Sequence, residues 1–202
     1  MTRQGAWTMC LGLAASGVLT AVLAVDAGQG TPLEEIWQQL ADDDGATANR
    51  AIWRMALAKT DAVAFLSERV KPAAGDRQQV EQLIRNLDSN VFIVRDRASA
   101  ELERLGDAAE EALKHALMAN SKLETKRRIE ALLARLREME SSPDGIRYER
   151  SLDALELIGD ADALALLRKL ASGNAAARRT RLAQESLARL STRRRVEAPT
   201  AP

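Results

Sequence analysis

Apolar residues recur along most of this chain at spacings of three and four, in short blocks separated by short turns. The block at 129–136 is typical, with Ile or Leu at positions 129, 132, 133 and 136. This spacing places the apolar side chains on one face of an α-helix, because a helix has about 3.6 residues per turn. Gly, Asp, Ser and Asn fill the turns, where they end one helix and cap the next. The pattern predicts an all-α fold of about ten helices.

The composition agrees with a helical fold. Aromatic residues make up 3% of the chain, while Ala, Leu, Glu and Arg are abundant. Straight-chain residues and Ala lose little rotamer freedom in a helix, and no run is rich in the β-branched and aromatic residues that strands prefer. Because the turns are short, we expect consecutive helices to be antiparallel.

The blocks are also similar to one another. Residues 97–117 align with 150–170 when shifted by 53, and the turn Gly106-Asp107 then falls on Gly159-Asp160. A shift of 47 in the other direction aligns the same window with residues 50–70. The repeating unit is a helix, a tight turn and a second helix.

Single helices are expected beside these units, at 122–139 and 174–191. A helix pair cannot bury its apolar stripe alone, so neighbouring pairs must stack to make a continuous core. The sequence therefore predicts a right-handed α-solenoid of stacked antiparallel helix pairs over residues 31–191. The polar and Pro-containing end, residues 192–202, is predicted to be a disordered tail.

The central unit carries a recognisable motif: Asp88, Val94-Arg95, Ala98, Leu102, Leu105-Gly106-Asp107 and Leu113. This stretch resembles the HEAT-like repeat of the PBS-lyase type. The resemblance implies that Asp88 and Arg95 take part in a ladder of contacts between adjacent repeats. In the third unit Tyr148 stands where Arg95 would fall, and Arg147 comes one place early. More broadly, residues 33–191 resemble a bacterial helical module found C-terminal to WD40 propellers or as a small exported protein.

Residues 1–27 predict export from the cytoplasm. A basic start with Arg3 precedes the uncharged apolar run Leu11–Val25, and small residues follow up to Ala27. This order is typical of a secretory signal peptide. The alternative is an uncleaved membrane anchor over residues 8–25, whose 18 residues reach the short end of the about 17–25 that a membrane span requires. Both interpretations predict a periplasmic or otherwise extracytoplasmic protein.

The sequence contains few residues of the kinds that form catalytic or metal-binding sites. The single cysteine, Cys10, lies in the leader, and the single histidine, His115, is expected on the flank or outer face of a helix. The acidic run Asp42–Asp44 lacks the spacing of a calcium loop and is expected to cap a helix. No phosphate-binding loop or nucleophile motif is present. The sequence therefore predicts no catalytic, cofactor or metal site, and a protein that is not an enzyme.

Charge is unevenly placed although the formal net charge is zero. Residues 168–195 hold nine bases and one acid, and residues 34–44 hold five acids and no base. One interpretation is that these charges complement helix dipoles. The other is a basic patch for an acidic partner or an anionic envelope surface. The residues that would form that patch are Arg178, Arg179, Arg181 and Arg189.

Two tryptophans, Trp37 and Trp53, occur in the first helices. We expect both to be large apolar filler where the solenoid begins, since terminal repeats must seal the core. The alternative is that they are recognition aromatics on a groove.

These features together predict a non-catalytic protein-interaction scaffold, exported from the cytoplasm, with a protein partner. The neutral charge argues against a nucleic-acid binder, and membrane contact is expected only through the N-terminal segment if it stays uncleaved. One alternative is an extracytoplasmic regulatory or sensory domain on a membrane anchor. The other is a HEAT-fold enzyme such as a bilin-lyase-like protein.

Overall fold

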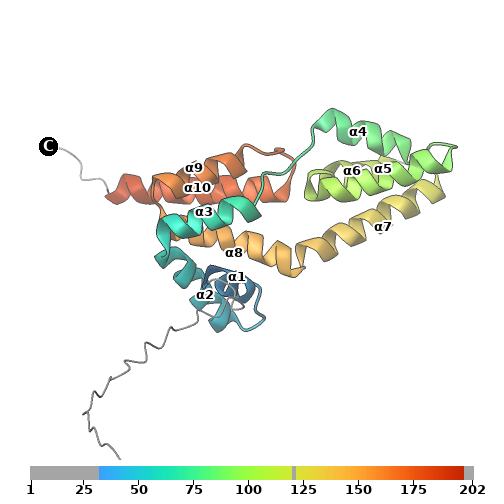
Figure 1. The fold of residues 1–202 in the computed structure, drawn as a ribbon. Helices are drawn as coiled ribbons and strands as arrows, with labels where there is room; N and C mark the ends of the chain where they lie inside the picture. Colours follow the sequence, from blue (N-terminus) through green and yellow to red (C-terminus); the bar gives the residue numbers. More distant parts are fainter. Residues whose placement is uncertain (1–31, 120–121, 198–202) are drawn as a thin grey trace, which may run out of the picture.

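The computed structural model describes residues 32–119 and 122–197, and over these ranges the chain is all-α (Figure 1). The described residues form ten α-helices and one 3₁₀ turn, without a strand. The elements are α1 (Pro32–Gln39), α2 (Gly45–Leu57), α3 (Lys59–Arg69), α4 (Arg77–Asn86), α5 (Phe92–Leu105), η1 (Gly106–Ala108), α6 (Glu110–Ala119), α7 (Leu123–Glu140), α8 (Pro143–Ile158), α9 (Ala161–Ala171) and α10 (Arg178–Glu197). The prediction of an all-α fold with about ten helices is confirmed.

Each window spans parts of two consecutive helices. Residues 50–70 run from within α2 to the end of α3, residues 97–117 run from within α5 through η1 into α6, and residues 150–170 run from within α8 into α9. The two single helices expected after the second and third windows correspond to α7 and α10.

Short polar side chains begin several helices. Asp44 caps α2 by accepting hydrogen bonds from the backbone N–H groups of Ala46 (3.2 Å) and Thr47 (3.0 Å). Asp160 caps α9 in the same way, accepting from Ala163 N at 2.8 Å. These bonds satisfy amides that have no partner inside the helix. Within the acidic run at 42–44, Asp44 is the residue that caps.

The helices pack as two lobes (Figure 1). The end lobe contains α1–α3 from the N-terminal part and α8–α10 from the C-terminal part, and the central lobe contains α4–α7. In a solenoid each repeat contacts only its neighbours in sequence. Here α2 packs against α8 and α3 against α9, so the first repeat window lies on the third. The second window lies in the other lobe, and the described helices do not form a single row in sequence order.

Each lobe has its own apolar core. Fully buried leucines include Leu155 and Leu167 in the end lobe and Leu102 and Leu113 in the central lobe. Burying one such side chain contributes about 1.5–3 kcal/mol. The two lobes can therefore each hold their helices together, and their relative position depends on the junction between them.

The junction is built from small residues and backbone hydrogen bonds. The segment between α3 and α4 lies against the loop between α9 and α10, where Asn174 donates from its backbone N to Ala73 O (3.0 Å) and from Nδ2 to Gly75 O (2.9 Å). A small cluster of Ala73, Ala108 and Ala177 fills the space beside these bonds. These contacts join residues about a hundred positions apart in the chain.

The two tryptophans differ. Trp37 is partly buried against the end-lobe core and meets the Phe65 ring edge to face, with ring centroids 6.2 Å apart. Trp53 is 53% exposed, so the prediction that it fills the core is wrong. Ala51 and Met55 form the buried face of α2. Two residues turn a helix by about 200°, which directs Trp53 to the opposite side.

The two ends of the chain lie partly outside the residues that the structure describes. Helix α10 continues to Glu197, beyond residue 191, where we expected a tail to begin. Arg193 contributes to this extension, because its guanidinium donates to the carbonyl of Glu156 in α8. The proposed signal peptide (1–27), the alternative anchor (8–25) and residues 198–202 lie outside the described residues. Among the described helices, none is long and apolar enough to cross a membrane.

Candidate binding cleft

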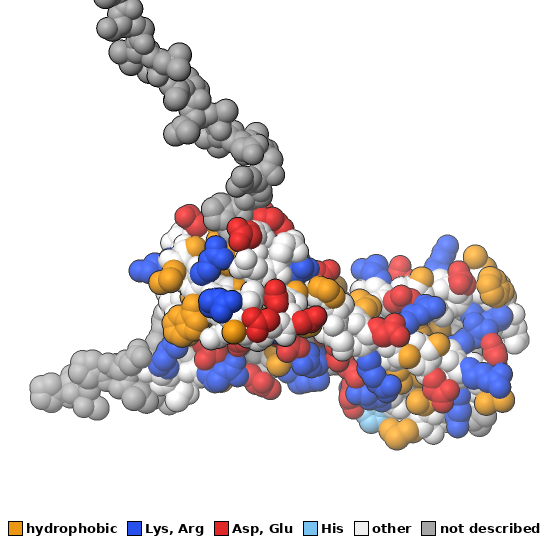
Figure 2. Space-filling view, turned by 90° about the horizontal axis from the view of Figure 1, so that it is seen from below, with side chains coloured by type: hydrophobic (Ala, Val, Ile, Leu, Met, Phe, Trp, Pro, Cys, Tyr) orange, Lys and Arg blue, Asp and Glu red, His pale blue; other side chains and the backbone are white. Residues whose placement is uncertain are grey.

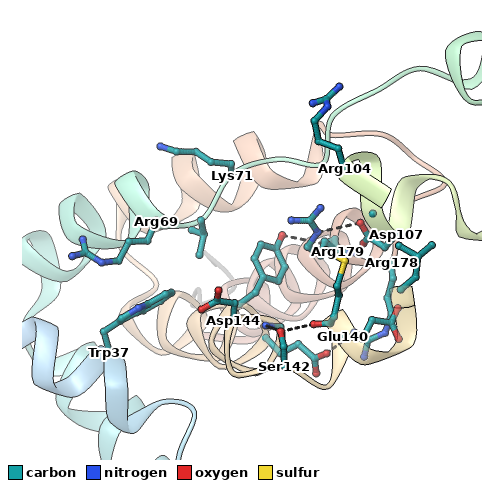
Figure 3. Close-up of a pocket in the computed structure, with 17 residues that line it drawn as sticks. Trp37, Arg69, Lys71, Arg104, Asp107, Glu140, Ser142, Asp144, Arg178 and Arg179 are labelled. Carbon is teal, nitrogen blue, oxygen red and sulfur yellow. Dashed lines mark hydrogen bonds and ion pairs between the residues drawn. The ribbon is translucent and has the colours of Figure 1, made fainter. Parts of the chain in front are cut away.

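A cleft of about 640 Å³ lies at the junction of the two lobes (Figure 3). Its walls come from α1 and α3, from the end of α5 with η1, from the corner between α7 and α8, and from the start of α10. Both lobes and both halves of the chain therefore contribute to it. Its volume lies in the range of sites that take a small molecule or a few side chains of a partner, about 300–1,000 Å³.

The corner between α7 and α8 forms the floor of this cleft. Ser142 caps α8 by accepting from Gly145 N at 3.2 Å, and its hydroxyl donates to Met139 O at 2.6 Å. A Cβ atom at Gly145 would lie 2.3 Å from Glu140 O, which no side chain tolerates. The tight turn therefore depends on glycine at this position, and it places Met139 and Tyr148 in the wall of one cavity.

The inner wall is an ion pair between the lobes. Asp107 of η1 is 8% exposed. It accepts a hydrogen bond from Arg179 N at 2.6 Å and another from Arg179 Nε at 3.1 Å. The Arg179 guanidinium carbon lies 5.8 Å from the centre of the Tyr148 ring, and the Tyr148 hydroxyl donates to Arg179 O at 3.2 Å. Three side chains from η1, α8 and α10 thus fix one another.

Burial changes the acidity of Tyr148. Its side chain is 5% exposed, and burial raises its pKa to about 12, against a smaller opposing effect of the Arg179 charge. The phenol is therefore protonated at neutral pH and acts as a donor to the α10 backbone.

Charged side chains are separated across the mouth of the cleft. Figure 3 places Arg69, Lys71 and Arg104 along one side, and Glu140 and Asp144 along the other. Lys71 is exposed, and its Nζ donates to the carbonyl of Ser67 at 2.7 Å. It has no acidic partner among the described residues.

The other two bases of this side are paired within the protein. Arg69 Nη2 lies 2.6 Å from Glu34 Oε2, and Arg104 Nη2 lies 2.9 Å from Glu101 Oε2. Hydrogen bonds from Gln38 and Arg69 lower the pKa of Glu34, so this carboxylate stays ionised.

Apolar groups lie between the two charged sides. Trp37 and Tyr148 line the cleft with Met139, which is 48% exposed. An aromatic or thioether surface between opposed charges suits an extended peptide segment, since it can take an apolar side chain while the rims bind charged ones.

The predicted basic patch has partners inside the molecule. Arg178 bonds to Glu149, and Arg189 Nε lies 2.9 Å from Glu156 Oε2. Arg181 Nη1 donates to Ala176 O at 2.6 Å. Of the four arginines, Arg178 and Arg179 line the cleft.

Helix dipoles do not account for the bases at the start of α10. Arg178, Arg179 and Arg181 lie in its first turns, where a helix favours negative charge. Their ion pairs and hydrogen bonds to residues outside α10 explain their presence instead.

Asp88 and Arg95, which the resemblance places in a ladder between repeats, make separate contacts. Asp88, in the turn between α4 and α5, accepts from Lys122 Nζ at 2.6 Å and from Thr125 Oγ1 at 2.9 Å. These hydrogen bonds lower the pKa of its carboxyl. Arg95 Nη1 donates to Ser89 O at 2.8 Å. Asp88 thus joins its turn to the start of α7, and Arg95 braces the turn itself.

The single histidine lies away from the cleft. The His115 side chain is 70% exposed, and its Nε2 is 3.3 Å from Glu111 Oε1 on the same helix. Within the described part of the chain, no group of three or more His, Cys, Asp or Glu side chains is arranged to hold a metal ion.

Sequence reasoning missed most of the cleft. Lys71 and Met139 have no distinguishing pattern in the sequence, and a place for Trp37 on a groove is only the alternative to a role as core filler. One signal did exist, because Tyr148 departs from the repeat motif at the position equivalent to Arg95. A residue that departs from a repeat motif can have a role of its own at that position. Here Tyr148 takes part in the contact between the two lobes.

A comparison with protein-family models, with curated proteins and with solved structures returns no match.

Proposed function

We propose that this protein is a non-catalytic interaction scaffold, built from HEAT-like helix pairs, that takes a polypeptide segment of a partner protein in the cleft between its lobes. The observation that supports this most is the cleft itself. Its accessible apolar surface at Trp37 and Met139 lies between one side that carries Lys71 and another that carries Glu140 and Asp144.

The groups of the cleft are suited to binding. Asp107, Arg178 and Arg179 are each engaged with another residue of the protein. The protonated Tyr148 donates to backbone. Such fixed groups provide a preformed surface, and a preformed surface lowers the entropy cost of association.

Cellular location is a separate part of the proposal. The leader at residues 1–27 supports export to the periplasm or another extracytoplasmic space. Cell fractionation and the intact mass of the mature protein test this. A protein retaining residues 8–25 would favour the alternative of a regulatory or sensory domain held on a membrane anchor.

Site-specific photo-crosslinking tests the cleft. A photo-reactive amino acid replaces Met139 in the full-length protein, and a second variant carries it at Leu57, which is 76% exposed on the end lobe outside the cleft. We expect a crosslinked partner from position 139 and none from position 57. Lys71→Glu should reduce that crosslink, whereas Lys169→Glu, an exposed base on α9, should leave it unchanged.

Two results would contradict the proposal. Crosslinks from position 57 equal to those from position 139 would mean that capture does not involve the cleft. If Lys71→Glu left the crosslink from position 139 unchanged, the separated charges of the cleft would have no role in binding the partner.

A further inference from the structure

The exposed apolar side chains of the protein are not scattered. Eight large apolar side chains are exposed among the described residues, and five of them are Val91, Phe92, Ile93, Met118 and Leu123. Their exposed fractions run from 53% for Val91 to 75% for Met118. Single exposed apolar residues need no explanation, but a cluster marks an interaction surface.

These five residues lie at the free end of the central lobe. Val91 is the N-cap residue of α5, Phe92 and Ile93 begin that helix, Met118 is next to the last residue of α6, and Leu123 begins α7. Hydrogen bonds from Lys122 and Thr125 to Asp88 hold the α4–α5 turn against the start of α7. In Figure 1 this end points away from the end lobe. We call these five residues the apolar tip.

Positive charge surrounds the apolar tip. Residues 85–97 and 122–128 together contain seven Lys or Arg and three acids, a formal charge of +4, in a chain whose total is zero. Figure 2 shows hydrophobic side chains beside Lys and Arg at the outer end of this lobe.

Pairing inside the protein leaves part of this charge unmatched. Lys122 is paired with Asp88, and Arg128 with Glu124. Arg97, Lys126 and Arg127 have no acidic partner among the ion pairs of the described residues, and Arg97 and Arg127 are exposed.

Helix stability accounts for only one of the α7 bases. Arg128 pairs with Glu124 one turn earlier on the same helix, an arrangement that stabilises a helix. Lys126 and Arg127 fall in the second turn of α7, which begins at Leu123, and have no such partner among the ion pairs of the described residues. Their charge is therefore available to an external anionic surface.

We propose that the apolar tip docks on an anionic lipid bilayer, with Phe92 and Ile93 entering the interface and the α7 bases at the level of the lipid phosphates. The tip is formed by the ends of helices and projects from the lobe, which suits a bilayer interface better than the groove of a folded partner. Apolar insertion combined with electrostatic attraction is the usual means of peripheral membrane binding. The sequence alone predicts membrane contact only through the N-terminal segment, if that segment stays uncleaved.

Vesicle binding with a site-specific probe tests this proposal. The full chain with Cys10→Ser and Ile93→Cys carries an environment-sensitive fluorophore at position 93, and a control carries it at Leu57→Cys. Vesicles are made of phosphatidylcholine with or without phosphatidylglycerol. We expect the emission at position 93 to shift to shorter wavelength only with phosphatidylglycerol vesicles, and the emission at position 57 to stay constant. Because the probe reports on its own position, insertion of the N-terminal segment does not imitate this result.

Variants separate the two contributions to binding. Lys126→Ala with Arg127→Ala should weaken vesicle binding about twentyfold to thirtyfold, since each base near an anionic surface contributes a factor of about five. Arg168→Ala with Lys169→Ala removes two exposed bases from the other lobe and should change binding little. Phe92→Ser should weaken binding at least tenfold without lowering the melting temperature, because Phe92 is 64% exposed.

Three results would overturn the proposal. No emission shift at position 93 with phosphatidylglycerol vesicles would exclude insertion of the tip. Vesicle binding unaffected by Phe92→Ser would assign it to another segment. Self-association or binding of a protein that Phe92→Ser abolishes, without vesicle binding, would make the tip a protein interface. None of these results bears on the crosslink from Met139, so the cleft and the tip can fail independently.

Discussion

The carboxylate of Asp107 caps a helix that begins 71 residues later in the chain, by accepting hydrogen bonds from the backbone N (2.6 Å) and the side-chain Nε (3.1 Å) of Arg179. Helix α10 has no acid in its first turn. A carboxylate at a helix start satisfies a free amide and interacts favourably with the dipole. Because Asp107 belongs to the central lobe and Arg179 to the end lobe, this cap also fixes the lobes to each other.

Removing this cap should weaken the whole junction. We expect Asp107→Ala to lower the free energy of unfolding by about 2–4 kcal/mol, because a nearly buried amide and part of a guanidinium lose their partner. Urea denaturation followed by circular dichroism measures the change.

Asp160 supplies a matched control, because it occupies the equivalent position of the third repeat window but caps only its own helix, α9. Asp160→Ala should cost about 1 kcal/mol, the usual effect of a lost N-cap. Equal losses for the two variants would show that Asp107 has no role beyond an ordinary cap.

The tight corner between α7 and α8 requires a residue without a side chain at position 145. We expect Gly145→Ala to destabilise the protein by about 1–3 kcal/mol, because a Cβ atom there would lie 2.3 Å from Glu140 O and 2.7 Å from Met139 O. Thermal melting compares it with Gly45→Ala in α2, where no atom lies within 4 Å of the added Cβ. Gly45→Ala should be neutral or stabilise by up to about 1 kcal/mol. Tolerance of alanine at position 145 would mean that the corner is not tightly specified.

Local structure was predictable from the sequence because helices are determined by short-range spacing. The apolar spacing at 129–136 located α7, and the Gly159-Asp160 turn located the boundary between α8 and α9. These signals depend on residues a few positions apart. They state which face of a helix is buried but not which other helix covers it.

The arrangement of the lobes could not be predicted for this reason. Gly106-Asp107 and Gly159-Asp160 look equivalent in sequence, yet Asp160 caps its own helix and Asp107 caps α10. The stacking of α2 on α8 depends on contacts about a hundred residues apart. The cleft is a product of that arrangement, so its residues carried almost no local signal.

Two arginines of α8 hold the end of α1. Arg150 donates to the carbonyls of Leu40 and Asp42, the latter at 3.1 Å, and Arg147 Nε donates to Trp37 O at 3.1 Å. These carbonyls have no partner within the helix, and a cation there also complements the dipole. We expect Arg150→Ala to cost about 1.5–3 kcal/mol and to speed hydrogen exchange at the amides of α1.

An arginine with weaker contacts supplies the control for Arg150. Arg54 on α2 is exposed and bonds to Gln39 Oε1 at 2.9 Å. Arg54→Ala should change stability by no more than about 0.5 kcal/mol. Unchanged exchange in α1 after Arg150→Ala would contradict the capping role.

Alkaline titration of the protein reports on Tyr148, which is its only tyrosine. Burial raises the pKa of the phenol from about 10 to about 12, so the folded state binds this proton more tightly than the unfolded chain does. The contribution of Tyr148 to stability is therefore constant below pH 10. It falls by up to about 2–3 kcal/mol as the pH rises from 10 to 12, because the unfolded state loses its proton first.

Tyrosinate absorbance should show a midpoint near 12 in the folded protein and near 10 in urea. Tyr148→Phe should abolish the signal and cost about 1 kcal/mol at neutral pH through the lost bond to Arg179 O. A folded-state midpoint near 10 would place the phenol in water and contradict its position in the wall between the lobes.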